Sequence, residues 1–178
     1  QAHQNNIIHR AVKPENILIK NDIPKLMNFD LSFQLEDNRL TVIPDASKVK
    51  DDGYLAPEIL FGGDIDESTD FFSLGVIAYQ LLTGEKPFKS TREFVTRGGE
   101  LSTQNLQKLR KTKVPEHVIN GIKEMIVADR VKRVKDIQAV LSVFACEKEQ
   151  EDKVGEDLPV NPWLQPGDRH DMYEIVEF

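Results

Sequence analysis

The longest apolar stretch of the chain runs over residues 71–83, where hydrophobic side chains fall on nearly every face of a helix. A helix that is apolar all round is a buried one. Gly84 and Pro87 follow, and both residue types are typical of the end of a helix. Three side chains just before the stretch offer N-cap oxygens: Ser68, Thr69 and Asp70. The pattern therefore predicts a buried central helix over residues 71–83.

Shorter helices are predicted after this central one. Residues 91–96 suit a short helix, which Gly98 and Gly99 would end. Pro115 can open another, because proline is favoured at a helix start. Apolar residues recur along it at helical spacing: Val118, Ile122, Met125 and Ile126. A last helix is expected from a final apolar stripe: Ile137, Val140, Leu141 and Phe144.

The remaining apolar segments are short and favour strands. Residues 17–19 and 25–27 flank residues 21–24, which carry turn chemistry, and together they predict a β-hairpin. Residues 173–178 alternate between polar and apolar, which is typical of a strand. Residues 1–6 are polar and are interpreted as the end of a helix that begins outside this chain. The expected fold class is α+β, predominantly helical with a short hairpin.

Composition narrows the class of protein. With 178 residues, 39% of them hydrophobic and 30% charged, the chain suits one soluble globular domain. No apolar run approaches the ~20 residues that span a bilayer, and the first residues lack the pattern of a signal peptide. The net charge is −7 and no long basic run occurs, so neither nucleic acid nor membrane is an expected partner. A single cysteine, Cys146, suits a reducing compartment, and we expect a cytoplasmic protein.

The stretch His-Arg-Ala-Val-Lys-Pro-Glu-Asn over residues 9–16 resembles the catalytic loop of protein kinases, H-R-D-L-x-x-x-N. Four positions of the motif are filled as in that family: His9, Arg10, Lys13 and Asn16. Ala11 stands where the catalytic aspartate belongs. Twelve positions after Asn16, the tripeptide Asn28-Phe29-Asp30 stands where kinases have the metal-binding Asp-Phe-Gly.

Later motifs follow in the order of the same family. Residues 56–58 are Ala-Pro-Glu, and residues 70–88 closely resemble the central buried helix of a kinase C-lobe. The resemblance therefore implies a kinase-like C-lobe, with the N-lobe outside this chain. Residues 33–54 would be the activation segment. Its Thr41 and Ser47 are candidate phosphorylation sites, although ordinary loop hydroxyls are the more frequent case.

The resemblance also implies structural roles for several residues. His9 and Arg10 would brace the loop, and Arg10 could receive a phosphorylated or acidic activation segment. Asp70 would accept hydrogen bonds from the backbone of the loop. Glu58 and Arg133 would form a buried ion pair that ties the activation segment to the later helices.

Four positions bear on chemistry, and two of them have lost a carboxylate. Lys13 would approach the transferred phosphate and Asn16 a second Mg²⁺. Ala11 cannot act as the general base, a contribution typically worth ~10²–10⁴-fold in rate. Asn28 offers a neutral oxygen where Mg²⁺ prefers a carboxylate. The sequence thus keeps the supports of the site and lacks its two principal acids.

Asp30 offers one route around this loss. In an extended backbone, residues two apart project to the same face, so Asp30 could place its carboxylate beside Asn28 as a substitute metal ligand. A solvated turn residue is an equally good interpretation of Asp30.

We therefore expect a pseudokinase C-lobe over residues 1–146 that acts in regulation or protein interaction within a larger protein. Residues 147–170 would be an acidic linker with a docking segment, and residues 171–178 the first strand of a following kinase-like domain. The expected partners are its own N-lobe, that following domain and other proteins. No cofactor is expected for the fragment alone, while the intact protein could bind ATP and Mg²⁺. The alternative is an active, atypical Ser/Thr kinase that uses Asp30.

A specific parent is suggested by three stretches, at residues 27–30, 54–60 and 173–178. They resemble the large bacterial proteins that combine tandem kinase-like domains with nuclease or helicase modules in phage defence.

Overall fold

The computed structural model describes residues 2–34 and 50–145, all of which belong to one compact unit. Its helices are α1 (Pro57–Phe61), α2 (Glu67–Thr83), α3 (Thr91–Thr96), α4 (Thr103–Lys111), α5 (Glu116–Met125) and α6 (Ile137–Phe144). Its strands are β1 (Ile7–Ile8), β2 (Ile17–Lys20), β3 (Ile23–Leu26) and β4 (Phe33–Gln34). The expected α+β fold with a predominantly helical C-lobe and a short hairpin is confirmed.

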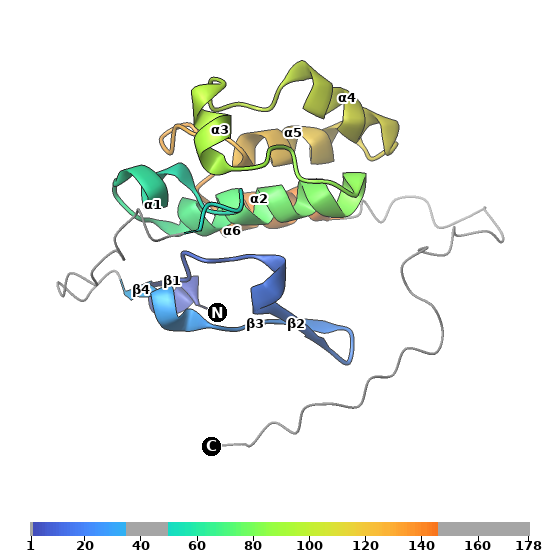
Figure 1. The fold of residues 1–178 in the computed structure, drawn as a ribbon. Helices are drawn as coiled ribbons and strands as arrows, with labels where there is room; N and C mark the ends of the chain where they lie inside the picture. Colours follow the sequence, from blue (N-terminus) through green and yellow to red (C-terminus); the bar gives the residue numbers. More distant parts are fainter. Residues whose placement is uncertain (1, 35–49, 146–178) are drawn as a thin grey trace. The chain divides into compact units, whose positions relative to one another are not determined.

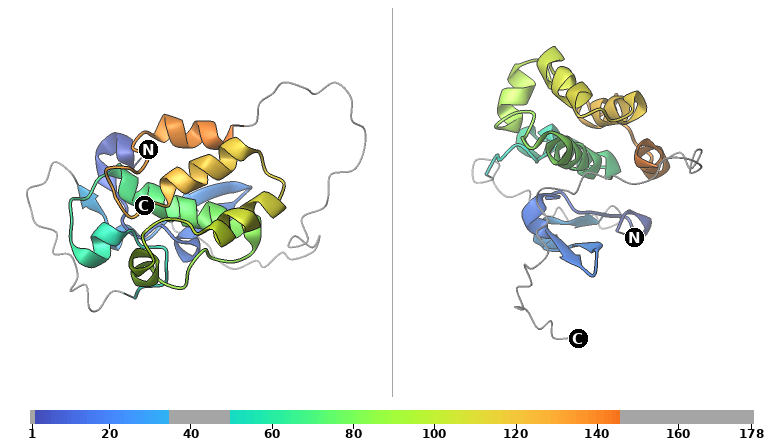
Figure 2. Two further views of the ribbon diagram at one scale, coloured as in Figure 1. Left: turned by 90° about the horizontal axis from the view of Figure 1, so that it is seen from above. Right: turned by 90° about the vertical axis from the view of Figure 1, so that its right-hand side faces the viewer.

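Helix α2 forms the centre of the core, as its apolar pattern predicts. Phe71, Phe72, Val76 and Tyr79 are each 0% exposed. Figure 1 shows α2 between the β segments and helices α4 and α5, and the right-hand view of Figure 2 shows the same order. Helix α2 packs against β1, α4 and α5, and α6 packs in turn against α5. This central helix thus supports both the loop that follows β1 and the later helices.

The start of α2 differs from the prediction. The helix begins at Glu67, and its N-cap is Asp66, whose carboxylate accepts a hydrogen bond from the backbone N–H of Ser68 at 2.9 Å. Asp70 lies within the first turn, and its carboxylate is used elsewhere. The end is as predicted: Gly84 adopts φ 79° and its N–H bonds to the carbonyl of Gln80.

Helix α4 has no counterpart in the prediction. Leu106 and Leu109 are its only apolar residues, so its hydrophobic pattern is weak. The helix is defined instead by a capping box between Ser102 and Asn105, which satisfies N–H groups at its first turn. Leu109 is fully buried against the core. Two leucines therefore anchor the helix, Leu109 fully buried and Leu106 partly buried against the core, and its other residues are polar.

Strands β2 and β3 form the predicted hairpin, but its turn is shorter than expected. Lys20 pairs with Ile23, so the turn contains only Asn21 and Asp22, and Pro24 lies within β3. Asn21 and Asp22 have φ 51° and 60°. Two positive φ values in a two-residue turn match the twist of the strands, and Asn and Asp tolerate them.

The segment before the loop is also shorter than predicted. Residues 3–5 form a single 3₁₀ turn, where the sequence suggested the end of a longer helix. Strand β1 follows and pairs antiparallel with β4, with Ile8 opposite Phe33. This pairing brings both ends of the 9–32 segment together beside α2.

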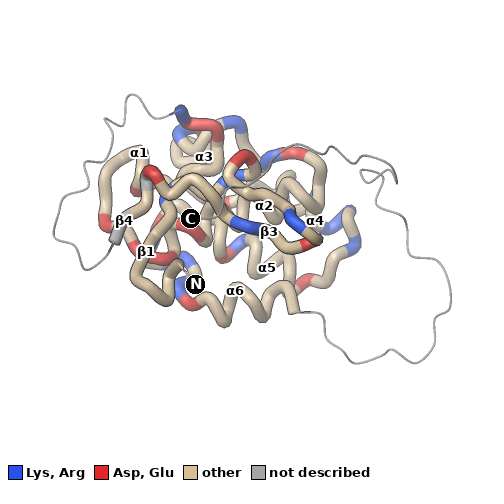
Figure 3. Tube along the Cα trace, turned by 90° about the horizontal axis from the view of Figure 1, so that it is seen from below, with Lys and Arg blue, Asp and Glu red and all other residues tan. Residues whose placement is uncertain are grey.

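Helix α6 is amphipathic only in part. Val140 is buried, but Ile137, Leu141 and Phe144 are 37%, 56% and 48% exposed. The apolar stripe that predicts the helix therefore lies largely at the surface. Helix α6 carries no charged residue, whereas acidic and basic residues are interspersed elsewhere in the described chain (Figure 3). In residues 2–34 and 50–145, no helix has both the length and the apolar character to cross a membrane.

Candidate functional site

The loop over residues 9–16 is anchored by the carboxylate of Asp70 at the start of α2. The backbone N–H groups of His9 and Arg10 donate to the two oxygens of Asp70, at 2.9 and 2.8 Å. These are the backbone donors that the sequence places on Asp70. A third donor is the Nε2 of His3, at 2.8 Å. The polar stretch around His3 carries no motif that predicts this contact. Asp70 is only 3% exposed, so these three charge-assisted hydrogen bonds offset its loss of water.

Arg10 takes a conformation that depends on this anchor. Its φ of 65° lies in the left-handed region, which is uncommon for residues other than glycine and marks stored strain. Its side chain is buried and its Nη2 donates to the carbonyl of Ser32 at 3.3 Å. Burial lowers the pKa of Arg10, and the negative charge of Asp70 partly offsets this effect. The loop is thus fixed at both backbone and side chain.

His9 connects the loop to the segment that follows the hairpin. Its Nδ1 accepts the N–H of Ala11 at 3.2 Å, which leaves Nε2 to donate to the carbonyl of Met27 at 2.8 Å. The edge of the ring contacts Phe29, with centroids 4.6 Å apart. His9 is fully buried, and its role is to hold the loop and residues 27–29 in one arrangement.

The three positions nearest to phosphoryl-transfer chemistry lie together and are neutral. Asn16 donates from Nδ2 to the carbonyl of Ala11 at 2.8 Å, and its Oδ1 accepts a hydrogen bond from Nδ2 of Asn28 at 3.4 Å. Ala11 and Asn16 are buried, whereas Asn28 is exposed with φ 62°. The side-chain oxygen of Asn16 is therefore already paired with an amide of the chain.

This donor set does not fit a Mg²⁺ ion. The side-chain amides of Asn16 and Asn28 are hydrogen-bonded to each other and carry no negative charge, whereas Mg²⁺ prefers carboxylate oxygens. Among residues 2–34 and 50–145, no group of three or more His, Cys, Asp and Glu side chains could hold a metal ion. No chemical step through a metal follows from these residues.

The geometric basis for Asp30 as a substitute ligand is wrong. Residues 29–31 form a 3₁₀ turn, and Asn28 before it is left-handed, so the backbone is not extended. With about three residues per turn, side chains two apart point to different sides. Asp30 is exposed, which agrees with a solvated turn residue.

Lys13 contacts a carboxylate that the sequence did not single out. Its Nζ lies 3.5 Å from Oδ2 of Asp52, in the segment before Tyr54. The neighbouring Asp51 accepts the backbone N–H groups of Thr91 and Arg92 at the start of α3, at 2.8 and 2.9 Å. In the sequence these two aspartates look like ordinary loop residues, because Thr91 and Lys13, which contact them, each lie about 40 positions away.

Glu58 and Arg133 form the buried ion pair expected from the sequence. The pair is bidentate, with N–O distances of 2.7 and 3.0 Å, and the Arg133 side chain is 0% exposed. Arg133 also donates to the carbonyls of Ser68 and Val127, each at 3.0 Å, and stacks over the ring of Phe72 at 5.1 Å. The pair joins α1 to the loop between α5 and α6 and to the start of α2.

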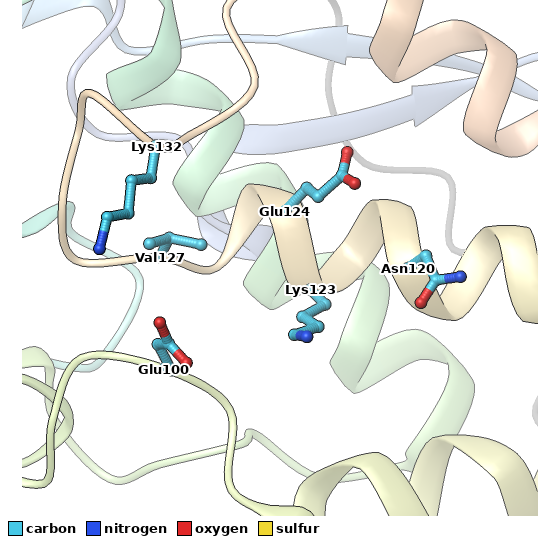
Figure 4. Close-up of a pocket in the computed structure, with 6 residues that line it drawn as sticks. All are labelled: Glu100, Asn120, Lys123, Glu124, Val127 and Lys132. Carbon is cyan, nitrogen blue, oxygen red and sulfur yellow. The ribbon is translucent and has the colours of Figure 1, made fainter.

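Of two hollows in the described chain, one reaches the anchor of the loop and neither includes its three neutral positions. The larger, about 780 Å³, is bordered by the hairpin, α2 and the N-terminal turn, and His9 and Asp70 reach its wall. The smaller, about 180 Å³, is shown in Figure 4 and is lined by Glu100, Asn120, Lys123, Glu124, Val127 and Lys132. Neither hollow is lined by Ala11, Asn16 or Asn28. Thr41 and Ser47 lie outside the described residues.

Comparison with known proteins identifies this arrangement. The family model for the protein kinase domain matches residues 1–144. The Ser/Thr-protein kinase PknB of Mycolicibacterium smegmatis is 43% identical over 88 residues, which is 49% of this chain and 14% of that protein. Aurora kinase of Yarrowia lipolytica is 33% identical over 138 residues, covering 75% of this chain and 34% of that kinase.

A solved structure supports the same fold. The twitchin kinase region from C. elegans matches with a TM-score of 0.52 and 25% identity, over 78% of this chain and 25% of that one. The chain therefore spans between 14% and 34% of the length of these relatives.

Proposed function

This chain belongs to the protein kinase family, and on that premise we propose that it is a catalytically impaired C-lobe that serves regulation or protein interaction. The observation that carries the proposal is the hydrogen bond between the side-chain amides of Asn16 and Asn28, beside Ala11. In an active kinase these positions provide a base and a charged metal ligand. Here they provide a methyl group and a neutral amide pair.

The retained framework supports a role that depends on shape. Asp70 still holds the loop, and Glu58 still pairs with Arg133 in the core. Truncating one partner of a buried pair typically costs about 3–5 kcal/mol, so such contacts maintain the fold whether or not catalysis occurs. A lobe that keeps its framework without its acids is suited to binding other proteins.

We place this lobe within a larger protein. Its partners would be an N-lobe, which would complete a nucleotide cleft able to take ATP, and a following kinase-like domain. The stretches at residues 27–30 and 54–60 support a parent of the bacterial tandem-kinase type that acts in phage defence. We propose a cytoplasmic location, in keeping with the single cysteine.

The proposal is tested by restoring the two acids in the full-length protein. We expect no phosphate transfer from [γ-³²P]ATP above background for the wild type, and measurable transfer for the Ala11→Asp/Asn28→Asp double variant. Asn28→Asp alone should make ATP affinity dependent on Mg²⁺, because it adds the charged oxygen that the ion prefers. The general base should then contribute a further ~10²–10⁴-fold in rate.

A matched control comes from the hairpin turn. Asn21 is also exposed and left-handed, with φ 51° against 62° for Asn28, so Asn21→Asp adds the same charge away from the site. It should change neither ATP affinity nor transfer. Wild-type turnover at ordinary kinase rates, about 1–100 per second, would overturn the proposal and favour an active atypical kinase.

A further inference from the structure

We propose that Asp52 occupies an anion-binding site formed by Lys13 and Lys86, and that a phosphate-bearing ligand binds there only by displacing its carboxylate. The assignment of Lys13 to the phosphate side rests on the proposed function. The contact between Lys13 and Asp52 does not rest on that function, because the structure shows it directly.

Both lysines contact the same residue. Nζ of Lys13 lies 3.5 Å from the Asp52 carboxylate, and Nζ of Lys86 donates to the Asp52 backbone carbonyl. Lys86 also lies over the ring of Tyr54, 5.0 Å from its centroid. The Lys13 side chain remains 33% exposed, so an anion from solvent can reach its ammonium group. Without the carboxylate, this surface would present two ammonium groups and one carbonyl.

The backbone around Asp52 is held firmly, so the carboxylate is presented to Lys13 in a fixed position. Asp51 accepts the N–H of Thr91 at 2.8 Å. Gly53 has φ 86°, and a Cβ atom there would lie 3.2 Å from the carbonyl oxygen of Phe88, so this backbone packs tightly. Displacing the Asp52 carboxylate therefore requires rotation of its side chain, which also breaks the hydrogen bond that it accepts from the backbone N–H of Tyr54 at 3.4 Å.

The charge near Tyr54 agrees with an acid-occupied site. Burial raises the pKa of Tyr54, and the negative charges of Glu15 and Asp52 raise it further, while its hydrogen bond to Gln80 lowers it. The negative charges of Glu15 and Asp52 thus act at the Tyr54 ring, over which Lys86 lies. Removing the negative charge of Asp52 would make the local electrostatic potential more positive, which favours the binding of an anion.

The experiment compares wild type with Asp52→Asn in the full-length protein, using inorganic phosphate as the probe at constant ionic strength. We expect phosphate to bind about fivefold more tightly to the variant, the factor given by losing one partly exposed ion pair. Labelling of lysines with an amine-reactive reagent, read by mass spectrometry, should rise at Lys13. Phosphoserine and ATP are titrated separately. The comparison shows whether Asp52→Asn increases the affinity more for the phosphate group of a protein or for that of a nucleotide.

Glu85→Gln is the matched control, because Glu85 pairs with Lys108 on the surface. It should raise labelling at Lys108, leave Lys13 unchanged and leave phosphate affinity unchanged. Adding Lys13→Gln to Asp52→Asn should abolish the gain. Asp52→Ser provides a second removal of the charge, should Asp52→Asn lower the melting temperature.

Equal phosphate affinity of wild type and both folded Asp52 variants would overturn the proposal. So would a gain that persists after Lys13→Gln. Phosphate transfer by the wild type is a separate readout, which refutes the impaired-kinase function without altering the phosphate-binding comparison.

Discussion

Replacing Arg133 with Met tests the energetic weight of the buried ion pair. Met fills a similar volume but cannot pair with Glu58, which is 8% exposed and would be left as a bare buried charge. The variant also loses the hydrogen bonds to the carbonyls of Ser68, Val127 and Ala128. Breaking a buried pair in this way typically costs about 3–5 kcal/mol of the free energy of unfolding. Because the whole domain is stable by only about 5–15 kcal/mol, the effect should be large.

The assay is urea unfolding followed by circular dichroism, on wild type, Arg133→Met, Glu58→Gln and the double variant. The double variant should cost less than the sum of the two singles, since Glu58→Gln removes the charge that Arg133→Met leaves unpaired. The exposed pair of Arg110 with Glu116 is the control, and Arg110→Met should cost at most about 1 kcal/mol. A loss below about 1 kcal/mol for Arg133→Met, or strictly additive effects, would refute the reasoning.

Two further predictions concern the helices. Gly121→Ala should lower the free energy of unfolding by about 1–3 kcal/mol, because the added Cβ atom would lie 2.2 Å from Cγ2 of Val143. Adding Val143→Ala should recover part of this loss in the same urea assay. Burial alone would raise the pKa of Asp66, but hydrogen bonds from Ser68 and the charge of Arg130 lower it below 3.8. The stabilisation by Asp66 is therefore present above that pH and is lost as the pH falls through the lower folded-state pKa. We expect Asp66→Asn to flatten the acid side of the curve of melting temperature against pH. An unchanged acid side would contradict the prediction.

Local sequence signals, namely the hydrophobic pattern and the glycines that end helices, were sufficient for some elements. Helix α3 has the expected bounds of residues 91–96, and Gly84 ends α2 where the sequence predicts. The pattern failed for α4, which has two apolar residues and depends on its capping box. It predicted α6, but most of the apolar stripe of this helix is exposed, because helical spacing shows which residues share a face without showing how much of that face a neighbour covers.

The candidate site divides in the same way. The order and spacing of Asn16, Glu58, Asp70 and Arg133 indicated the family from sequence, and the missing acids at Ala11 and Asn28 were visible there. The argument for Asp30 was wrong, since it assumed an extended backbone where the chain forms a 3₁₀ turn. Local conformation of three residues is set by their surroundings, and no periodicity in so short a segment reveals it.

The sequence by itself determined which groups are available. It provides a kinase-like framework with Lys13 in the loop, and it has no carboxylate at positions 11 and 28. Only the tertiary structure decided what those groups contact. The Asn28 amide turns to Asn16, His3 joins the donors on Asp70, and the Asp52 carboxylate lies beside Lys13. Each contact joins residues between 12 and 67 positions apart. Such pairings depend on how α2 and the β segments pack, and packing is a property of the whole fold rather than of any local pattern.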